Sequence, residues 1–567
     1  MESAVGVCPI TQITSGCFLR ERATGGVFYH HRVCARPVNE LLDAYLAARL
    51  GVPCVMKIGI LLLSFLLLLV SGFSGTSNCA FPPSTARSEK AIVNSSQSAL
   101  PDVEQRIQRI ENGLMLPIVI KGQPSISMKL ADRMQFYNTP GVSIAVINNG
   151  KIEWARGYGV REAGKKEPVT TETLFQAGSV SKPVAATMAL HMVQRRRLAL
   201  DEDVNKKLVS WKVPENEFTK EQKVTLRRIL SHSAGLTNNS AGNYTLGAEL
   251  PTLLQVLDGI KPANTPPIRV DFVPGSRWRY SGGGYGVAQQ LLIDTSGKPF
   301  PRIAQEIVFD CLKMKHSTFE QPLPERFQKT AAVGHNRNGE TIAGSWLTFP
   351  EMAAAGMWST PSDLARFALE LQKSKAGQSN KILSTEMTKQ MLTRQIQNWG
   401  LGLVVEGEGR SARFSHGGDT QGYNCQMNAY ENMGQGVVVM TNSDRGGLLI
   451  DEIIRSVARE YGWTDYHPKE KVIATVDPKV YDAYLGQYEL EISPDFVVTI
   501  SAENGKLTMT LKQPTGQSSA ELLPESENQF FRREVDFEMT FVKNDVGQVT
   551  GLIIRQGGAE YPAKKIK

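Results

Sequence analysis

The chain has 567 residues, and at roughly 150 residues per domain this length predicts about three to four units. Hydrophobic residues make up 41% of the sequence and charged residues 21%, which excludes wholesale disorder and a fibrous protein. The 63 basic and 56 acidic residues give a net charge of +7 without a long basic tract, so nucleic acid is not an expected partner.

Cysteine and histidine usage excludes two further classes of protein. The seven cysteines are Cys8, Cys17, Cys34, Cys54, Cys79, Cys311 and Cys425. Because five of them precede residue 80, the bulk of the chain is not a disulfide-stapled scaffold. The eight histidines form no HExxH sequence and no Cys/His cluster with ligand spacing, so we expect no built-in metal and no cofactor.

The first element along the chain is an apolar run at residues 58–70, IGILLLSFLLLLV. It follows Met56-Lys57 and is followed by small residues at 71–75. A basic start, a short apolar run and a small-residue exit predict a secretory signal peptide over residues 56–79. The alternatives are a retained N-terminal anchor that tethers the protein to a membrane, and a buried core helix. The signal peptide and the anchor both predict a location outside the cytoplasm: periplasmic, secreted or membrane-tethered.

The position of this run is unusual, because signal peptides begin their chains. We therefore expect translation to start at Met56, and residues 1–55 not to belong to the native protein. Residues 80–101 are rich in serine and proline and predict a polar linker.

Residues 102–462 combine helix and strand patterns. Helices are expected near residues 102–115 and 448–461, and strands at 141–159, 400–405, 424–430 and 436–441. Asn149-Gly150 in the first of these strand regions is a strong hairpin signal. Strands at both ends with helices between them predict an α/β (α+β) body in which one antiparallel sheet carries a helical lobe.

The composition changes after Trp463. Residues 463–472 are polar and predict a second linker. Strand-like runs then follow at 496–500, 506–511, 537–542 and 551–556, with turn signals between them. Residues 473–567 are therefore expected to form a small all-β barrel or sandwich.

The strongest chemical feature is Ser179 with Lys182, in the stretch FQAGSVSK before a good helix pattern. A serine at a helix start lies where free backbone N–H groups favour negative charge. Lys182 follows one turn later, so its amine can reach the serine oxygen and activate it if the pocket keeps the amine neutral. Taken alone, S-x-x-K occurs by chance, and a plain helix cap explains the serine equally well.

Two later stretches carry further polar groups beside glycines. Tyr280 begins YSGGGY, a pattern typical of a turn that holds a phenol rigidly, although a single tyrosine is equally a packed aromatic. His416 begins HGGD just before an expected strand, where glycines let a substrate approach the backbone closely. A lone histidine there is equally a buried core residue.

The three elements in this order resemble the serine β-lactamase and penicillin-binding-protein superfamily, especially class C β-lactamases, D-aminopeptidases and related esterases. The stretches at 230–236 and 356–364 support the resemblance and are interpreted as structural. The terminal strands resemble the lipocalin-like domain appended to some secreted members. By this resemblance Ser179 is the acylated nucleophile, Lys182 its general base, and Tyr280 the group that shuttles protons to the leaving group.

The resemblance also implies the substrate-binding edge. His416 occupies the place of the third motif's lysine, with Gly417 and Gly418 completing the motif. Backbone N–H groups of Ser179 and Asp419 would form the oxyanion hole.

Two departures from the family pattern affect the expected substrate. Gly282 replaces the asparagine that ends the second motif, and His416 replaces a lysine. The predicted function is a serine hydrolase acting on a small molecule or peptide, cleaving an amide, an ester or, more weakly, a β-lactam. The alternative is a catalytically silent sensor or binding module. An unperturbed histidine titrates near ~6.5, so His416 is expected to modulate recognition between about pH 5.5 and 7.5.

Overall fold

The computed structural model describes residues 102–567 except 125, 239–243, 492, 514–515 and 557–558. The expectations for residues 1–55, 56–79 and 80–101 therefore lie outside the described residues. In the described part of the chain, no helix is long and apolar enough to cross a membrane. The two cysteines that it includes, Cys311 and Cys425, are both free.

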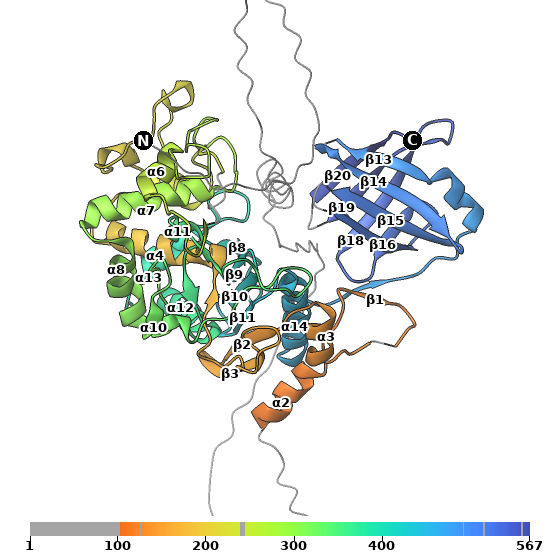
Figure 1. Cartoon of the computed structure of the whole chain (residues 1–567), viewed down its shortest axis with the longest axis horizontal. Coiled ribbons are helices and arrows are strands. Elements are labelled where there is room, and N and C mark those ends of the chain that lie inside the picture. Colours follow the sequence, from red (N-terminus) through yellow and green to blue (C-terminus); the bar gives the residue numbers. More distant parts are fainter. Residues whose placement is uncertain (1–101, 125, 239–243, 492, 514–515, 557–558) are drawn as a thin grey trace, which may run out of the picture. The chain divides into compact units, whose positions relative to one another are not determined.

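A six-stranded antiparallel sheet forms the centre of the body (Figure 1). In spatial order its strands are β3 (Lys151–Gly159), β2 (Gly141–Asn148), β11 (Gly436–Thr441), β10 (Tyr423–Tyr430), β9 (Arg413–Thr420) and β8 (Val404–Glu406). The predicted hairpin is confirmed: Asn149 and Gly150 join β2 to β3 at φ values of 52° and 69°. Strands from both ends of the region pair in one sheet, as predicted.

The strand predicted at 400–405 is shorter than expected and begins only at Val404. Gly402 has a φ of 91°, and its N–H donates a hydrogen bond to Leu230 O at 2.9 Å. The N–H of Leu401 similarly donates to Met391 O. The backbone before Val404 is thus hydrogen-bonded to the helical lobe and not to the sheet.

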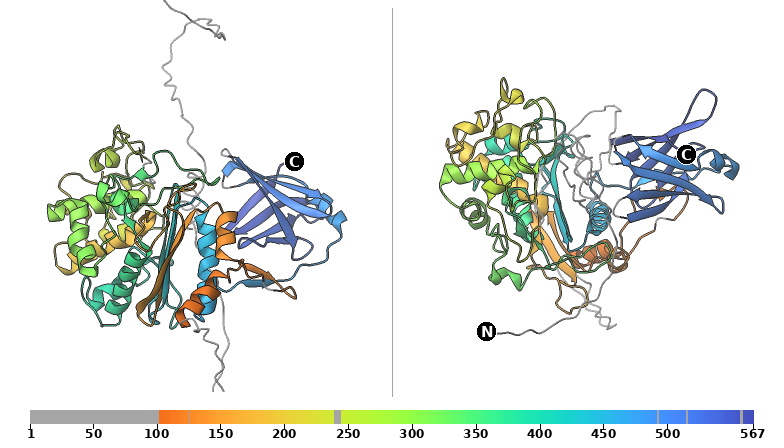
Figure 2. Two further views of the ribbon diagram at one scale, coloured as in Figure 1. Left: turned by 60° about the horizontal axis from the view of Figure 1, so that its bottom comes forward. Right: turned by 45° about the horizontal axis from the view of Figure 1, so that its top comes forward.

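Helices cover both faces of the sheet (Figure 2). Side chains of β2 alternate between two cores: Ala145 and Ile147 pack in the core shared with the helical lobe, while Ile144 and Val146 pack in the opposite one. The opposite face is covered by α14 (Gly446–Glu460), α2 (Asp102–Glu111) and α3 (Leu130–Phe136). Burial on both faces explains the nearly continuous apolar sequence of β2.

The helical lobe lies between β3 and β8 in sequence. Its α-helices are α4 (Ser181–Gln194), α5 (Leu226–Leu230), α6 (Leu253–Asp258), α7 (Gly282–Ser296), α8 (Phe300–Ala304), α9 (Asp310–Leu312), α10 (Glu325–Gln328), α11 (Met352–Ala355), α12 (Pro361–Lys375) and α13 (Thr385–Met391). Helix α12 packs against the sheet, and α4, α7 and α11 pack against one another. The lobe therefore brings the start of α4 and the start of α7 to the same region.

The C-terminal residues form a closed barrel of eight antiparallel strands, each paired with its neighbour in sequence. The strands are β13 (Gly486–Leu490), β14 (Ser493–Glu503), β15 (Lys506–Gln513), β16 (Gly516–Pro524), β17 (Gln529–Arg532), β18 (Phe537–Lys543), β19 (Val549–Gln556) and β20 (Ala559–Lys565). Alternate residues of β18 (Phe537, Met539 and Phe541) point inward and are buried. The barrel alternative of the prediction is confirmed, and aromatic side chains fill part of its interior.

Candidate active site

Ser179 lies in a 3-10 turn, η1 (Gly178–Val180), that leads directly into α4. The Ser181 hydroxyl donates to Gly178 O at 2.6 Å and accepts the N–H of Met357 at 3.0 Å, which fixes the turn. Ser179 is half-buried, whereas most of α4 is fully buried. The turn thus presents one serine hydroxyl at the N-terminal end of a buried helix, where the helix dipole favours an anion.

Lys182 lies one turn further along, with its Nζ 3.0 Å from Ser179 Oγ and 2.8 Å from Ala354 O. The carbonyl of Ala354 belongs to the single-turn helix α11, whose C-terminal carbonyls lack partners within the helix. Lys182 is 2% exposed, and this burial lowers its pKa to about 7. Near neutral pH a large fraction of the amine is therefore uncharged and has a lone pair that can accept the Ser179 proton.

Two tyrosine rings help to bury this amine. The Tyr280 ring centroid lies 4.8 Å from Lys182 Nζ, and that of Tyr285 lies 5.6 Å away. The glycines after Tyr280 do not form the predicted turn: they are the first turn of α7, and Ser281 caps it by accepting the N–H of Gly284. The N–H of Gly282 donates to the Asn238 side-chain oxygen at 3.2 Å. A side-chain amide, that of Asn238, therefore lies beside Gly282, which has no side chain.

The stretch expected to precede a strand lies inside β9 instead. Strand β8 pairs only with residues 413–415 of β9, so the following residues of β9 face η1. A Cβ on Gly418 would lie 2.0 Å from Ala177 O, and one on Gly178 would lie 2.8 Å from Asp419 N. Glycine is therefore required at 418 for strand and turn to touch, a structural role beside the predicted one of letting a substrate approach the backbone. This contact brings the backbones of Ser179 and Asp419 together.

The neighbouring Gly417 is less tightly constrained. A Cβ there would lie 2.9 Å from the side-chain oxygen of Gln426, which is the far end of a flexible side chain. Gly417 instead provides the carbonyl to which the His416 imidazole donates, with a distance of 2.6 Å from Nδ1 to the oxygen.

His416 does not behave as an ordinary surface histidine. It is 3% exposed, and burial, followed by the nearby Lys182, lowers its pKa to about 3. With Nδ1–H donating to Gly417, the other nitrogen, Nε2, is buried and has no hydrogen-bond partner among the described residues. The expectation that His416 changes charge between about pH 5.5 and 7.5 is therefore wrong, because the imidazole is already neutral over that range.

The structure adds residues that sequence reasoning missed. His232, in the stretch interpreted as purely structural, stacks on the Tyr280 ring at 4.3 Å between centroids and an interplanar angle of 29°. Trp399 lies perpendicular to this imidazole at 4.8 Å and also contacts the rings of Tyr280 and His416. A single histidine in a turn and a single tryptophan in a loop carry no sequence signal for this cluster.

Comparison with known protein families assigns the larger part of the chain. Residues 127–457, more than half of the chain, match the family model described as Beta-lactamase. The chain belongs to this family. The family comprises serine hydrolases that include amidases, penicillin-binding proteins and β-lactamases. Residues 470–565 match a domain of unknown function, DUF3471.

Individual members of the family show how far the similarity extends. Penicillin-binding protein 4* of Bacillus subtilis (strain 168) is 22% identical over 459 residues, which cover 77% of this chain and 97% of that protein. A β-lactamase of Pseudomonas fluorescens is 27% identical over 241 residues, 41% of this chain and 60% of that protein. The octameric penicillin-binding protein homologue from Pyrococcus abyssi has a TM-score of 0.51 at 20% identity and covers 77% of this chain and 98% of its own, a likeness that shows the fold.

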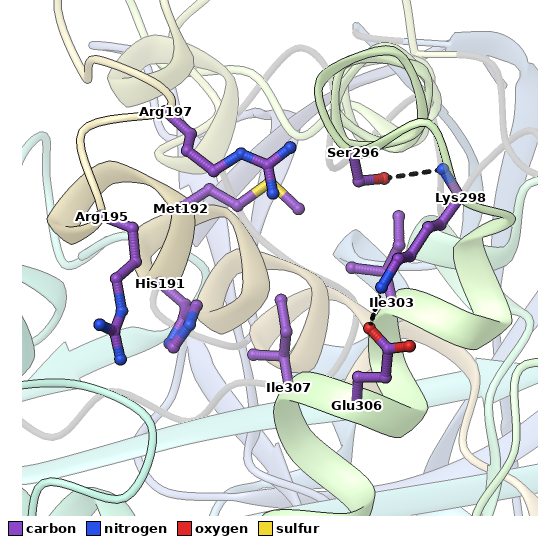
Figure 3. A pocket seen from close by; sticks show the side chains of 9 residues that line it. All are labelled: His191, Met192, Arg195, Arg197, Ser296, Lys298, Ile303, Glu306 and Ile307. Carbon is purple, nitrogen blue, oxygen red and sulfur yellow. Dashed lines mark hydrogen bonds and ion pairs between the residues drawn. The ribbon is translucent and has the colours of Figure 1, made fainter.

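A cavity of about 160 Å³ lies away from the β-lactamase-like site, at the other end of α4 (Figure 3). At ~1.5 Å per residue, α4 separates the two by about 20 Å. Arg195, Arg197 and the Lys298–Glu306 ion pair line the cavity. Its serine and histidine are bonded to backbone carbonyls: Ser296 Oγ donates to Leu292 O at 2.8 Å, and His191 Nδ1 lies 2.8 Å from Ile382 O. Its cations lie where helix C-termini stabilise them.

The described residues contain no group of three or more His, Cys, Asp or Glu side chains that could hold a metal ion.

Proposed function

We propose that this chain is an exported serine hydrolase that cleaves an amide or ester through an acyl-enzyme on Ser179. The observation that carries the proposal is the Lys182 amine, which lies 3.0 Å from Ser179 Oγ and has a pKa lowered to about 7. A nucleophile needs an adjacent base that is unprotonated at working pH, and this pair provides one.

In the first half of the reaction, neutral Lys182 takes the Ser179 proton as Oγ bonds to the substrate carbonyl carbon. The negative charge on the carbonyl oxygen is stabilised by the backbone N–H groups of Ser179 and Asp419. Tyr280 passes a proton to the leaving nitrogen or oxygen as its bond to the carbonyl carbon breaks. In the second half a water attacks the acyl ester, gives a proton back through Tyr280 and Lys182, and frees Ser179.

At the edge of the site, the neutral His416 imidazole favours uncharged polar groups in the substrate over a carboxylate. His416 has no charge at neutral pH with which to hold a carboxylate, since its pKa is lowered to about 3. Gly282 supplies no side-chain amide of its own for the acylamide arm of a penicillin, and the side-chain oxygen of the adjacent Asn238 already accepts the Gly282 N–H. A peptide amide or a small ester is therefore the proposed substrate, and a β-lactam would be cleaved slowly. Amide cleavage is also consistent with the likeness, at a TM-score of 0.50 and 21% identity, to a D-amino acid amidase from Ochrobactrum anthropi SV3, which covers 64% of this chain and 100% of its own.

Export is proposed on the sequence of residues 56–79 alone, since a basic start and a short apolar run are typical of a signal peptide. N-terminal sequencing of the native protein tests it. A mature start after residue 70 supports export with cleavage, whereas a peptide from residues 1–50 in the native protein would contradict a start at Met56.

The hydrolase proposal is tested by covalent labelling. Wild-type protein treated with a fluorophosphonate or a fluorescent penicillin should gain the mass of one label, and Ser179→Ala should gain none. Turnover of nitrocefin, p-nitrophenyl esters and D-amino-acid amides then identifies the substrate class. Absence of label and turnover in the wild type would instead favour the silent sensor or binding module.

A further inference from the structure

His232 lies in the turn after α5 with a left-handed backbone, at a φ of 59°. Its carbonyl accepts the N–H of Arg279 at 2.8 Å, and its ring Nδ1 accepts the N–H of Ser281 at 3.1 Å. These two donors are the neighbours of Tyr280 on either side. One residue in a conformation that is uncommon outside glycine therefore holds the backbone on both sides of the proposed proton shuttle.

The imidazole of His232 also holds the phenol ring. It stacks on Tyr280 with 4.3 Å between centroids, and Trp399 packs perpendicular to it at 4.8 Å. Trp278 lies 6.3 Å away, at an interplanar angle of 78°. His232, Trp399 and Trp278 are 2%, 1% and 4% exposed. The imidazole is thus enclosed, and it cannot leave the Tyr280 ring without opening the cluster.

The hydrogen bonding of His232 excludes a direct role in proton transfer. Because Nδ1 accepts the Ser281 N–H, the ring proton is on Nε2 and the imidazole is neutral. Burial is the main cause that holds its pKa well below 6.5, and the nearby Lys182 and His416 lower it further. With Nδ1 occupied by the backbone, and Nε2 fully buried without a hydrogen-bond partner among the described residues, His232 acts on the reaction through its neighbours.

We propose that His232 is a positioning residue that fixes the ring and the backbone of Tyr280 beside Lys182. The proposal rests on the proposed function, in which Tyr280 hands a proton to the leaving group. The Lys182 amine lies 4.8 Å from the centroid of the Tyr280 ring, and the imidazole stacks on that ring. If the imidazole were lost, the phenol would be free to rotate, and proton delivery to the leaving group would suffer.

Two substitutions separate the contributions of the ring and of its nitrogen. His232→Asn keeps a hydrogen-bond acceptor near the Nδ1 position and tolerates the left-handed backbone, but it removes the stacked ring. His232→Phe keeps a ring and removes the acceptor. His335→Asn is the matched control, since His335 is 0% exposed and its two ring nitrogens are hydrogen-bonded to the backbones of Ala163 and Asn442.

The dependence on the leaving group distinguishes positioning from a general loss of stability. A p-nitrophenolate leaves an ester without being protonated. The amine of an amide with the same acyl group must be protonated before it can leave. His232→Asn should lower kcat/KM for the amide about 10- to 100-fold more than for the p-nitrophenyl ester, as Tyr280→Phe should. His232→Phe should keep the wild-type ratio within about threefold, and the double variant His232→Asn/Tyr280→Phe should lose no more than Tyr280→Phe alone. Equal losses on both substrates, as expected for His335→Asn, or additive losses in the double variant would overturn the proposal.

A crystal structure of His232→Asn tests the positioning without reference to catalysis. The Tyr280 ring should be displaced while the Ser179–Lys182 contact, 3.0 Å in the wild type, is kept. An unmoved ring would refute the role of His232. If Tyr280→Phe slows both leaving groups equally, the proposed role of Tyr280 fails, and the crystal comparison still decides whether His232 positions its ring.

Discussion

Replacing Lys182 by methionine should abolish activity and at the same time make the folded protein more stable. The Lys182 amine is buried, and this burial lowers its pKa from 10.5 to about 7. A group whose folded pKa lies below its unfolded value destabilises the folded state wherever the unfolded chain is protonated. The penalty is therefore fully present below about pH 7, shrinks as the pH rises, and is gone above about pH 10.5.

The size of the effect follows from the two pKa values. A fall from 10.5 to about 7 corresponds to about 5 kcal/mol of destabilisation at low pH, and to about 4 kcal/mol near pH 7.5. Against this, the methionine leaves Ala354 O without its donor, which costs about 1–3 kcal/mol. Lys182→Met should therefore raise the free energy of unfolding by about 1–3 kcal/mol near pH 7.5.

Urea denaturation of the full chain near pH 7.5 and near pH 10 measures this difference, with Lys207→Met as the control. Lys207 is exposed, so its replacement should leave the free energy of unfolding unchanged at both pH values. The advantage of Lys182→Met should shrink as the pH rises. A variant that is less stable than wild type near pH 7.5, or whose advantage is the same at both pH values, would show that burial does not depress this amine.

The remaining predictions concern rates. In the wild type, kcat/KM should rise with pH to a plateau with an apparent pKa of about 7, because Lys182 must be neutral to accept the proton; a rate independent of pH between about 5.5 and 8.5 would contradict this assignment. Gly418→Ala should lower the labelling rate at least about 100-fold, since its Cβ would lie 2.0 Å from Ala177 O and push β9 away from the serine turn. Gly447→Ala in α14, where a Cβ would come no nearer than 3.4 Å to its neighbours, is the control and should label at the wild-type rate.

Local features of the sequence predicted the fold well. The β2–β3 hairpin was predictable because Asn149-Gly150 suits a turn with two positive φ values, and the barrel because alternate residues such as Phe537, Met539 and Phe541 are apolar. The start of α4 followed from the helix pattern after the serine. Each of these features depends on residues close together in the chain.

The parts of the site that escaped prediction depend on residues far apart in the chain. His232, Tyr280 and Trp399 are brought together by three separate loops, and nothing in any one loop indicates the others. The predicted titration of His416 was wrong for the same reason. It assumed an ordinary pKa, whereas the burial that lowers this pKa comes from tertiary packing. The predicted start of the strand at residue 400 was wrong because the backbone before Val404 is hydrogen-bonded to α5 and α13 and not to the sheet.

The neutrality of His416 gives a reason why a histidine stands where the resemblance to the superfamily implies a lysine. A cation at this position would lie near the Lys182 amine and would lower its pKa further below about 7, because like charges disfavour each other. A base with a lower pKa is deprotonated at lower pH but accepts a proton less readily. His416→Lys should therefore shift the rising limb of the pH–rate profile to lower pH and reduce the plateau, while favouring substrates that carry a carboxylate. His416→Gln, which adds no charge, should leave the limb in place. If His416→Lys also keeps the wild-type limb and substrate preference, a charge at position 416 does not affect Lys182, and His416 only packs the edge of the site.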